Sequence, residues 1–530
     1  MPTFTLTVLD IPGIQKYIFG SNRLRENIGA SELVYRATSR WPLEILYHTG
    51  GSNVRDPAGG DLDETQHIED GHLIAEVVYV GGGNVVVLFH ERERAVQFVT
   101  QLSRKMAEEA PGLGLAVAHV PVEWGTDRLG QKVDEAMKQL AQNKRTWRPS
   151  TPLLGLSVTA GCRSTGLVAT TTNAEHGKPQ GEETYPISDE VAAKLDMMAL
   201  AESRLHDLCR EIQKTGYVFP RDFDDLGRTR GEMSYIAVIH ADGNRMGQFF
   251  RDIADKYLDS RGYIKEVRRA SQSVKEASQN ALRQIGNALL AAVETREGKK
   301  SMVGGVVLIE HNKLPFRPIV FGGDDVTFVC DGRLGLTLAT RYLEAFEQET
   351  RAVGLNLYAC AGIAVVKAHY PFARAYQLSE ALAGNAKRYV RDNPPGFSAL
   401  DWHFATGGLL GKLGEIRKRE YTREIHDREH RLYMRPLRLR EYPPDWHTWP
   451  RFVQVVTEFK DEWSDRRNKV VALRAALREG PDATQRFLVA YGEKLPILDE
   501  TASGLQETGW HDHTCGYFDV IEAMDFYVPV

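Results

Sequence analysis

Three aspartates stand at the ends of apolar segments, in contexts that suit metal and phosphate chemistry. Asp242 follows the apolar run 235–240, and Asp324 and Asp325 lie between two short apolar runs. Carboxylate oxygens are preferred ligands of Mg²⁺ and Mn²⁺. Two such ions on shared carboxylates can activate a hydroxyl and stabilise a leaving pyrophosphate. We therefore treat the three aspartates as candidate metal ligands and catalytic residues for nucleotidyl transfer.

The residues beside these aspartates suit a bound nucleotide. Gly322 and Gly323 let the backbone approach a ligand because they lack a Cβ. Gly243 and Asn244 stand at the predicted start of a helix, where free N–H groups bind phosphate oxygens. Each motif also has a structural explanation, since Gly-Gly-Asp-Asp makes a good hairpin turn and Asp-Gly can cap a helix. Their joint placement in one repeated unit favours catalysis.

A basic pair lies further along the chain. Lys387 and Arg391 are four residues apart near the end of a helix predicted from about residue 376, so they share one helix face. They could hold the triphosphate of a nucleotide. A solvated basic face at a helix C-terminus, which the helix dipole favours, explains them equally well.

The elements that must position these residues occur twice. Each copy is predicted to run β-α-β-β-α-β, the ferredoxin-like unit with an antiparallel sheet. The second copy comprises strand 235–240, a helix from about 264 to 297, hairpin 318–329, helix 336–353 and strand 355–366. The first comprises strand 5–9, a mostly helical stretch 14–38, hairpin 77–89, helix 94–108 and strand 113–122. Where the second hairpin has two aspartates, the first has Gly83-Asn84, so only the second copy keeps a full carboxylate set.

The predicted fold class is therefore α+β, with two ferredoxin-like palm domains that form a pseudo-dimer. We expect a degenerate first palm over residues 1–123, a linker domain over 124–232, a second palm over 233–405 and a helical domain over 406–530. In the last of these, residues 449–476 carry a helix-like apolar stripe. The nearby tryptophans are interpreted as core residues rather than base-stacking platforms: Trp402, Trp446, Trp449 and Trp463.

A basic cluster in the C-terminal region has two interpretations. It comprises Lys412, Arg417, Lys418, Arg419 and Arg423. The cluster could contact RNA or a partner subunit, although a solvated charged face is the more common meaning of such a run.

Composition narrows the class of protein. The chain has 530 residues, 42% hydrophobic and 26% charged, with 66 basic and 71 acidic residues and a net charge of −5. This mix is typical of globular proteins and excludes disordered and fibrous ones. The five cysteines form no CxxC pair, which gives no sign of a disulfide framework. Without a signal-peptide pattern or an apolar run of about 18 residues, we expect a cytoplasmic protein with no membrane segment.

Four separated motifs resemble the large, polymerase-like subunit of type III CRISPR effector complexes, and they occur in the order of that family. They are LDIPGIQKYIFGSNRLRENIGAS, IHADGNRMGQFF, PIVFGGDDVTFVC and ACAGIAVVKAHYPFARAYQLSEALAGNAKR. The resemblance implies that the second palm converts ATP into cyclic oligoadenylates, which activate antiviral effector proteins. It assigns metal binding to Asp242, Asp324 and Asp325, and nucleotide contact to Gly322 and Gly323. Lys387 and Arg391 match the phosphate-binding AK-x₃-R helix of diguanylate cyclases, which are similar to this palm.

Two departures from the family pattern are visible. Members commonly begin with an HD nuclease domain, and none is expected here because the first palm strand starts near residue 4. The dipeptides His426-Asp427 and His511-Asp512 are interpreted as surface residues. Residues 124–232 contain only Cys162 and Cys209, too few for the four-cysteine zinc site of the family, so no zinc is expected.

The leading hypothesis is a synthase that uses two Mg²⁺ or Mn²⁺ ions and ATP to make cyclic oligoadenylate-type messengers, with a second nucleotide bound mainly by the first palm. The alternative is a scaffold subunit, without an HD domain, that binds CRISPR RNA and other effector subunits. A further alternative is a stand-alone nucleotide or dinucleotide cyclase, acting alone or as a homo-oligomer.

Overall fold

A computed structural model describes residues 2–146, 158–179, 181–227, 234–294, 301–394, 396–405, 411–442, 445–463, 466–499, 502 and 504–530. The chain forms two compact units. The first comprises Met1–Arg210, Arg245–Gln279 and Ile319–Val326. The second comprises Glu211–Asn244, Asn280–Pro318 and Thr327–Val530.

The first unit contains a four-stranded sheet. Its strands are β1 (Thr3–Asp10), β4 (Ala75–Gly81), β5 (Asn84–Phe89) and β6 (Ala116–Glu123), in the order β4-β5-β1-β6. Strand β1 pairs antiparallel with β5 and with β6, and α4 (Arg92–Glu109) connects β5 to β6. This is the predicted ferredoxin-like order of elements.

The helical stretch predicted over residues 14–38 is interrupted. This part of the chain forms α1 (Ile14–Phe19), α2 (Leu24–Tyr35) and the π-helical turn Arg36–Arg40, and α3 (Trp41–Thr49) follows directly. The break falls where the N–H of Arg23 binds the Ser21 hydroxyl, at 3.0 Å, instead of continuing a helical ladder. Local side-chain acceptors of this kind compete with helix hydrogen bonds.

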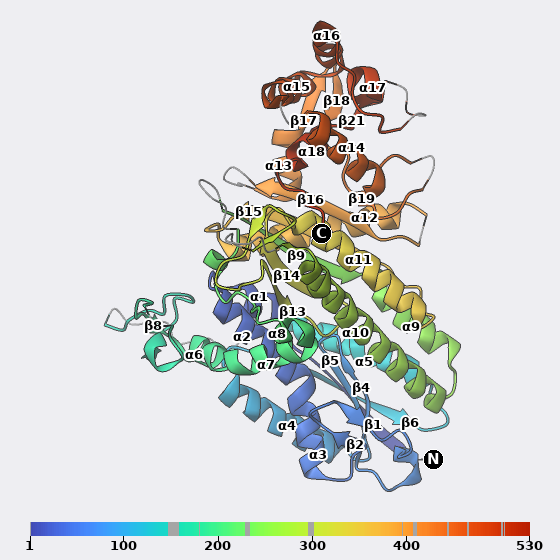
Figure 1. Ribbon diagram of the computed structural model, residues 1–530. Coiled ribbons are helices and arrows are strands. Elements are labelled where there is room, and N and C mark those ends of the chain that lie inside the picture. The colour runs from blue at the N-terminus through green and yellow to red at the C-terminus, as the bar shows by residue number, and fades with distance from the viewer. Residues whose placement is uncertain are drawn as a thin grey trace. The chain divides into compact units, whose positions relative to one another are not determined.

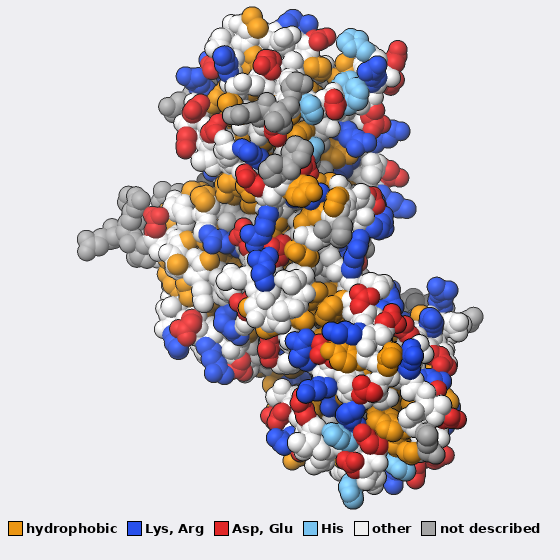
Figure 2. Space-filling model, turned by 90° about the vertical axis from the view of Figure 1, so that its right-hand side faces the viewer, with side chains coloured by type: hydrophobic (Ala, Val, Ile, Leu, Met, Phe, Trp, Pro, Cys, Tyr) orange, Lys and Arg blue, Asp and Glu red, His pale blue; other side chains and the backbone are white. Residues whose placement is uncertain are grey.

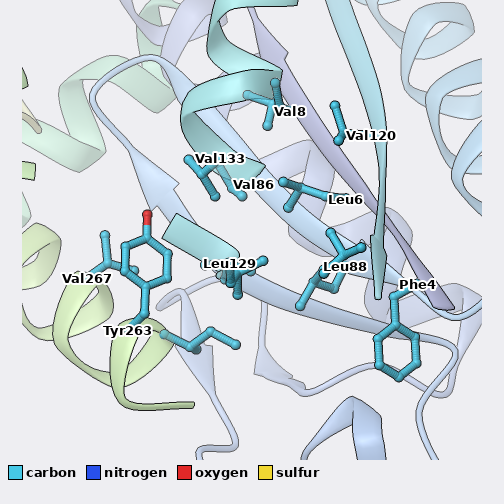
Figure 3. Close-up of a cluster of buried hydrophobic side chains, with 14 of the residues drawn as sticks. Phe4, Leu6, Val8, Val86, Leu88, Val120, Leu129, Val133, Tyr263 and Val267 are labelled. Carbon is cyan, nitrogen blue, oxygen red and sulfur yellow. The ribbon is translucent and has the colours of Figure 1, made fainter. Parts of the chain in front are cut away.

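Helices from two distant parts of the chain cover this sheet. The core contains alternate residues of β1 (Phe4, Leu6 and Val8), together with residues of α5 (Leu129–Thr146), α9 (Met246–Lys256) and the first part of α10 (Ser260–Ala291). Figure 3 shows the β1 side chains with those of Leu129 and Val133 on α5 and Tyr263 and Val267 on α10. A Cβ at Gly130 of α5 would lie 2.6 Å from the Cβ of Ala254, so α5 and α9 approach closely. The helix predicted from about 264 to 297 is α10, which begins at Ser260 and ends at Ala291.

The remaining elements of the first unit are short. They are β2 (Val54–Asp56), β3 (Asp61–Leu62), β7 (Thr171–Thr172), β8 (Pro186–Ile187), α6 (Asp189–Asp196), α7 (Met198–Leu208) and the 3₁₀ turns Ile68–Asp70 and Asn173–Glu175. Helix α8 (Arg210–Lys214) and the 3₁₀ turn Phe223–Asp225 begin the connection towards the second copy of the repeat.

A six-stranded sheet follows the same plan as the first. Its strands are β13 (Phe316–Val320), β14 (Val326–Asp331), β9 (Tyr235–Gly243), β15 (Ala359–Lys367), β16 (Ala399–Ala405) and β19 (Leu437–Arg438), in the order β13-β14-β9-β15-β16-β19. The first four repeat the order of the smaller sheet, and β15 pairs antiparallel with β9 and parallel with β16. Helices α11 (Gly335–Ala352) and α12 (Phe372–Asp392) agree with prediction, and the α+β class is confirmed. Short strands β10 (Val293–Glu294), β11 (Met302–Val303) and β12 (Val307–Leu308) form a separate small sheet.

The C-terminal region is less purely helical than predicted. It has α13 (Leu413–Tyr421), α14 (Trp449–Glu462), α15 (Arg467–Glu479), α16 (Pro481–Tyr491), α17 (Leu505–Thr508) and α18 (Phe518–Ala523). Among them lies a sheet of β17 (Thr422–Ile425), β18 (Arg428–Arg431), β21 (Thr514–Cys515) and β20 (Trp510–His511). Figure 1 shows β17, β18 and β21 among these helices. Strands of two to four residues are too short to show the alternation that identifies a strand in sequence.

Several predictions about burial are confirmed. The four tryptophans singled out above are all buried, at most 7% exposed, so they belong to the core. Of the two HD dipeptides, His426, Asp427 and Asp512 are exposed and His511 is half-buried. All five cysteines are unpaired and buried.

Two features describe the exterior. None of the helices formed by described residues combines the length and apolarity needed to cross a bilayer. Basic and acidic side chains are interspersed over the face shown in Figure 2.

Candidate functional site

In the second unit, the strand-end aspartate is paired with the predicted helix lysine. Asp242 lies one residue before the end of β9, in register with Cys360 of β15. The Lys387 ammonium, on α12, donates a hydrogen bond to Oδ2 of Asp242. Both side chains are about one-third exposed, 33% for Asp242 and 32% for Lys387, so a ligand from solvent can reach them.

Close packing of α12 on the sheet brings Lys387 to this aspartate. A Cβ at Gly362 of β15 would lie 1.9 Å from the carbonyl oxygen of Ser379 and 2.3 Å from the nitrogen of Ala383, both on α12. Only a glycine admits the helix at this distance. Arg391, one turn beyond Lys387, is exposed, and its Nε lies 3.3 Å from Oδ1 of Asp392. The structure therefore joins Lys387 to Asp242 but leaves Arg391 facing solvent.

A buried histidine lies behind the pair. Nδ1 of His240 is 3.3 Å from the Thr327 hydroxyl, and its ring packs edge-on against Tyr376. The pKa of His240 is lowered to about 4, mainly by burial; the Asp242 charge opposes this shift and the Lys387 charge contributes to it. The imidazole is neutral at pH 7, so Lys387 supplies the positive charge beside Asp242. Sequence reasoning missed this residue, although a histidine inside an apolar run is a recognisable signal.

The expectation of free backbone N–H groups at Gly243-Asn244 is wrong for Asn244. Its N–H donates to the carbonyl of Tyr358 at 2.8 Å. Strand β9 continues as far as Gly243, which pairs with Ala359, and this extends the ladder into the predicted turn. Helix α9 begins only at Met246, after Arg245 with a φ of 56°.

The Gly-Gly-Asp-Asp turn belongs to the first unit and borders a cavity of about 360 Å³. The turn contributes Gly322, Gly323 and Asp324 to the lining. Gly322 has a φ of 136°, a conformation that favours glycine. A Cβ at Gly323 would lie 3.5 Å from the Cα of Gly82, so the hairpin turns of the two copies approach each other here. All four turn residues, including Asp325, are half-buried rather than fully exposed.

The rest of the cavity lining is mixed in character. Aromatic rings of Tyr79 and Phe250 stack at 6.5 Å between centroids. Helix α10 contributes Ser271 and Lys275, and burial lowers the pKa of the Lys275 ammonium. A cavity with apolar walls, a few polar groups and a nearby carboxylate is the usual form of a small-ligand site.

The first copy of the repeat contains a matching ion pair that sequence reasoning missed. Asp10 ends β1, as Asp242 nearly ends β9, and pairs in register with Asn84 of the first hairpin. The Lys144 ammonium, on α5, donates to Oδ2 of Asp10, and burial raises the pKa of this carboxyl. Both copies therefore place a helix lysine on a strand-end aspartate. The two copies differ in the hairpin, where the first has the amide side chain of Asn84 and the second has the carboxylates of Asp324 and Asp325.

The donor chemistry suits hard divalent cations, although no cluster of three or more acidic, histidine or cysteine ligands exists among the described residues. Mg²⁺ is usually bound through one or two carboxylates plus water and substrate phosphates. Asp242 in the second unit and Asp324 in the first each offer one carboxylate of this kind.

Comparison with known proteins finds a family match for the second copy of the repeat. Residues 235–393 match the family model for the second palm domain of Cas10/Cmr2. The resemblance inferred from the motifs is confirmed for this segment. A search of curated proteins found no match.

Solved structures extend the similarity to the rest of the fold. The crystal structure of a Csm1–Csm4 cassette with cA4 aligns with a TM-score of 0.53 at 13% identity, covering 99% of this chain and 69% of that one. The cassette with AMPPNP gives 0.53 at 14% identity, covering 99% and 70%. Csm1 from T. onnurineus gives 0.52 at 14% identity, covering 100% and 70%. Beyond residues 235–393 as well, the fold of this chain is thus similar to that of Csm1 in these crystal structures.

Proposed function

We propose that this protein is a metal-dependent nucleotidyltransferase that converts ATP into cyclic oligoadenylate-type messengers in CRISPR-type antiviral defence. The observation that carries the proposal is the match of residues 235–393 to a Cas10/Cmr2 second palm that keeps both the Asp242–Lys387 pair and the Gly-Gly-Asp-Asp turn. Crystal structures of similar fold contain cA4 and AMPPNP, which favours adenine nucleotides as substrate and product.

The proposed metal ligands are Asp242, Asp324 and Asp325. The internal repeat supports their grouping, because Asp10 and Asn84 pair directly in the first copy. In the second copy, His240 contacts Thr327. Two residues further along β9 stands Asp242, and two residues before Thr327 stands Asp325. Bound Mg²⁺ or Mn²⁺ would polarise the α-phosphate and stabilise the leaving pyrophosphate.

The side chains around the metal ligands have separate roles in this proposal. In the free protein the Lys387 ammonium neutralises the Asp242 carboxylate. When the nucleotide binds, this ammonium contacts a phosphate oxygen instead. Arg391, exposed one turn away, contacts the end of the triphosphate. The cavity beside Gly322 and Gly323 receives the nucleoside, and its volume of about 360 Å³ lies within the range of small-ligand pockets.

The reaction then follows from positioning and charge. The 3′-oxygen of a second nucleotide, held mainly by the first copy, attacks the α-phosphorus of ATP. The new phosphorus–oxygen bond forms as the bond to the bridging oxygen breaks, pyrophosphate leaves, and the hydroxyl proton passes to solvent. Repetition followed by attack of the terminal 3′-hydroxyl on the chain's own 5′-triphosphate closes the ring.

A second candidate function is that of a scaffold subunit that binds CRISPR RNA and other effector subunits. The complex of Csm1 with Csm4 in a crystal structure of similar fold favours it. Both functions can belong to one chain, and only the first requires intact carboxylates.

Release of pyrophosphate from each labelled nucleoside triphosphate, with Mg²⁺ or Mn²⁺ and with or without target RNA, tests the proposal. The Asp324→Asn/Asp325→Asn double variant should reduce release at least 100-fold. The matched control, Glu108→Gln/Asp482→Asn, alters exposed carboxylates on α4 and α16 and should retain activity. Absence of release from wild-type protein under every condition would reject the enzyme and leave the scaffold.

A further inference from the structure

A second, larger groove lies in the second unit between α12, α13 and strand β18. Its volume is about 1,020 Å³, against about 300–1,000 Å³ for typical small-ligand pockets. Six basic side chains line it: Arg374, Arg388, Lys412, Arg417, Lys418 and Arg431. Glu429 is the one carboxylate among the described lining residues. The groove therefore has a formal charge of 6 − 1 = +5, in a chain whose net charge is −5.

Most of these cations are available to a ligand. Arg417 is buried and bound to Asp401 at 2.6 Å, and Arg431 lies 3.7 Å from Glu429. Arg388 donates to the neutral amide of Asn385. The other three, Arg374, Lys412 and Lys418, are exposed and form no ion pair with another described residue.

The arrangement differs from a solvated charged face. Cations on a convex surface point apart, whereas these converge on one concavity from two helices and a strand. Like charges gathered in a cleft focus the field and raise the local concentration of anions. The residues of the basic cluster seen in the sequence therefore differ in whether they line the groove. Lys412 and Lys418 line it, whereas Arg419 pairs with Glu420 and Arg423 donates to the backbone carbonyls of Arg419 and Thr422.

The uncharged lining indicates which polyanion fits. Tyr370 and Tyr433, both half-buried, offer aromatic surface beside the cations. Gly384 and Gly414 leave bare backbone, since no atom lies within 4 Å of a Cβ built at either position. Single-stranded nucleic acid is bound by this combination of a cationic track and stacking rings. An acidic peptide would match the charge of the groove, but its carboxylate side chains would not stack on the aromatic rings.

The groove is separate from the candidate catalytic pair. Lys387 contacts Asp242 from one side of α12, whereas Arg374, Ala381 and Arg388 face the groove. At 3.6 residues per turn, Arg374 and Lys387 point in directions about 140° apart.

We propose that this groove binds single-stranded nucleic acid, with Arg374, Arg388, Lys412 and Lys418 on the phosphates and Tyr370 or Tyr433 against bases. Four phosphate contacts to a single strand predict that log K falls with log salt at a slope of about −3. Mononucleotides, which present one phosphate group and one base, bind it weakly.

The test is fluorescence anisotropy of a labelled 12-nucleotide oligouridylate between 50 and 200 mM salt, in EDTA and without nucleotide. These conditions separate the result from the proposed catalysis. The Arg374→Gln/Lys418→Gln double variant should weaken binding at least tenfold and reduce the slope by about 1.4. Tyr370→Leu/Tyr433→Leu should weaken binding about fivefold or more with an unchanged slope.

The matched control is Arg104→Gln/Lys138→Gln, which removes two exposed cations from α4 and α5. It should leave binding within twofold of wild type. Equal weakening by the two charge variants, each verified as folded by circular dichroism, would overturn the proposal. So would equally effective competition by an oligoglutamate of the same charge, because that result would assign the groove to an acidic protein segment.

Discussion

The close contact between α12 and the sheet makes Gly362→Ala the most informative single change. An added methyl group would meet the Ser379 carbonyl oxygen at 1.9 Å, whereas ordinary contact begins at 3.4 Å. The helix must therefore move by about 1.5 Å, the difference between these distances. Overpacking of this kind costs about 1–3 kcal/mol of unfolding free energy.

The displacement also has a functional consequence. Lys387 is on the displaced helix, and its ammonium must reach both Asp242 and, in the proposed reaction, a phosphate. Misplacement of a reacting group by about 1 Å can cost about 100-fold in rate. We expect Gly362→Ala to lower the thermal midpoint by several degrees and to reduce pyrophosphate release by about that factor.

A control glycine on α12 itself separates the effect of close packing from the effect of adding a methyl group. Gly384 of α12 has no neighbour within 4 Å of a built Cβ, so Gly384→Ala should stabilise the helix by up to about 1 kcal/mol. Differential scanning fluorimetry and a pyrophosphate assay on both variants provide the measurements. A Gly362→Ala protein with wild-type midpoint and wild-type rate would refute the reasoning.

Three further outcomes are expected. Asp519→Ala should lower the free energy of unfolding in guanidinium by about 3–5 kcal/mol, because it leaves the fully buried Arg435, 2.9 Å away, without its partner. The control Asp482→Ala, at an exposed position, should change that free energy by less than about 0.5 kcal/mol. Lowering the pH from 7 to 5 should cost about 2 kcal/mol through His240, whose pKa of about 4 lies below its value of about 6.5 in the unfolded chain. This contribution is complete above pH 6.5 and is lost as the pH falls towards 4, so His240→Gln should make urea-unfolding free energies less dependent on pH over this interval. Chelation by EDTA should abolish pyrophosphate release and added Mn²⁺ should restore it, whereas a metal-independent rate would contradict the assigned chemistry.

Much of the second copy of the repeat could be predicted because its signals are local. The apolar run before Asp242 and the paired runs around the Gly-Gly-Asp-Asp turn identify strands within a few residues. The 3.6-residue period of α11 and α12 identifies helices. The apolar run nevertheless predicts too short a strand β9, because pairing with β15 rather than residue type extends it to Gly243.

The sequence by itself determined the repeat, the α+β class, the candidate aspartates and the similarity that residues 235–393 bear to a palm domain, because these depend on order and spacing along the chain. Only the tertiary structure decided which of those residues meet. It joined Lys387 to Asp242, paired Lys144 with Asp10, and bound the N–H of Asn244 to the Tyr358 carbonyl. It also showed that, within the basic cluster, Arg417 is buried, Arg419 is paired with Glu420, and Lys412 and Lys418 line the groove. Such contacts join residues more than 100 positions apart, and they follow from how closely helices pack on sheets, which no local pattern encodes.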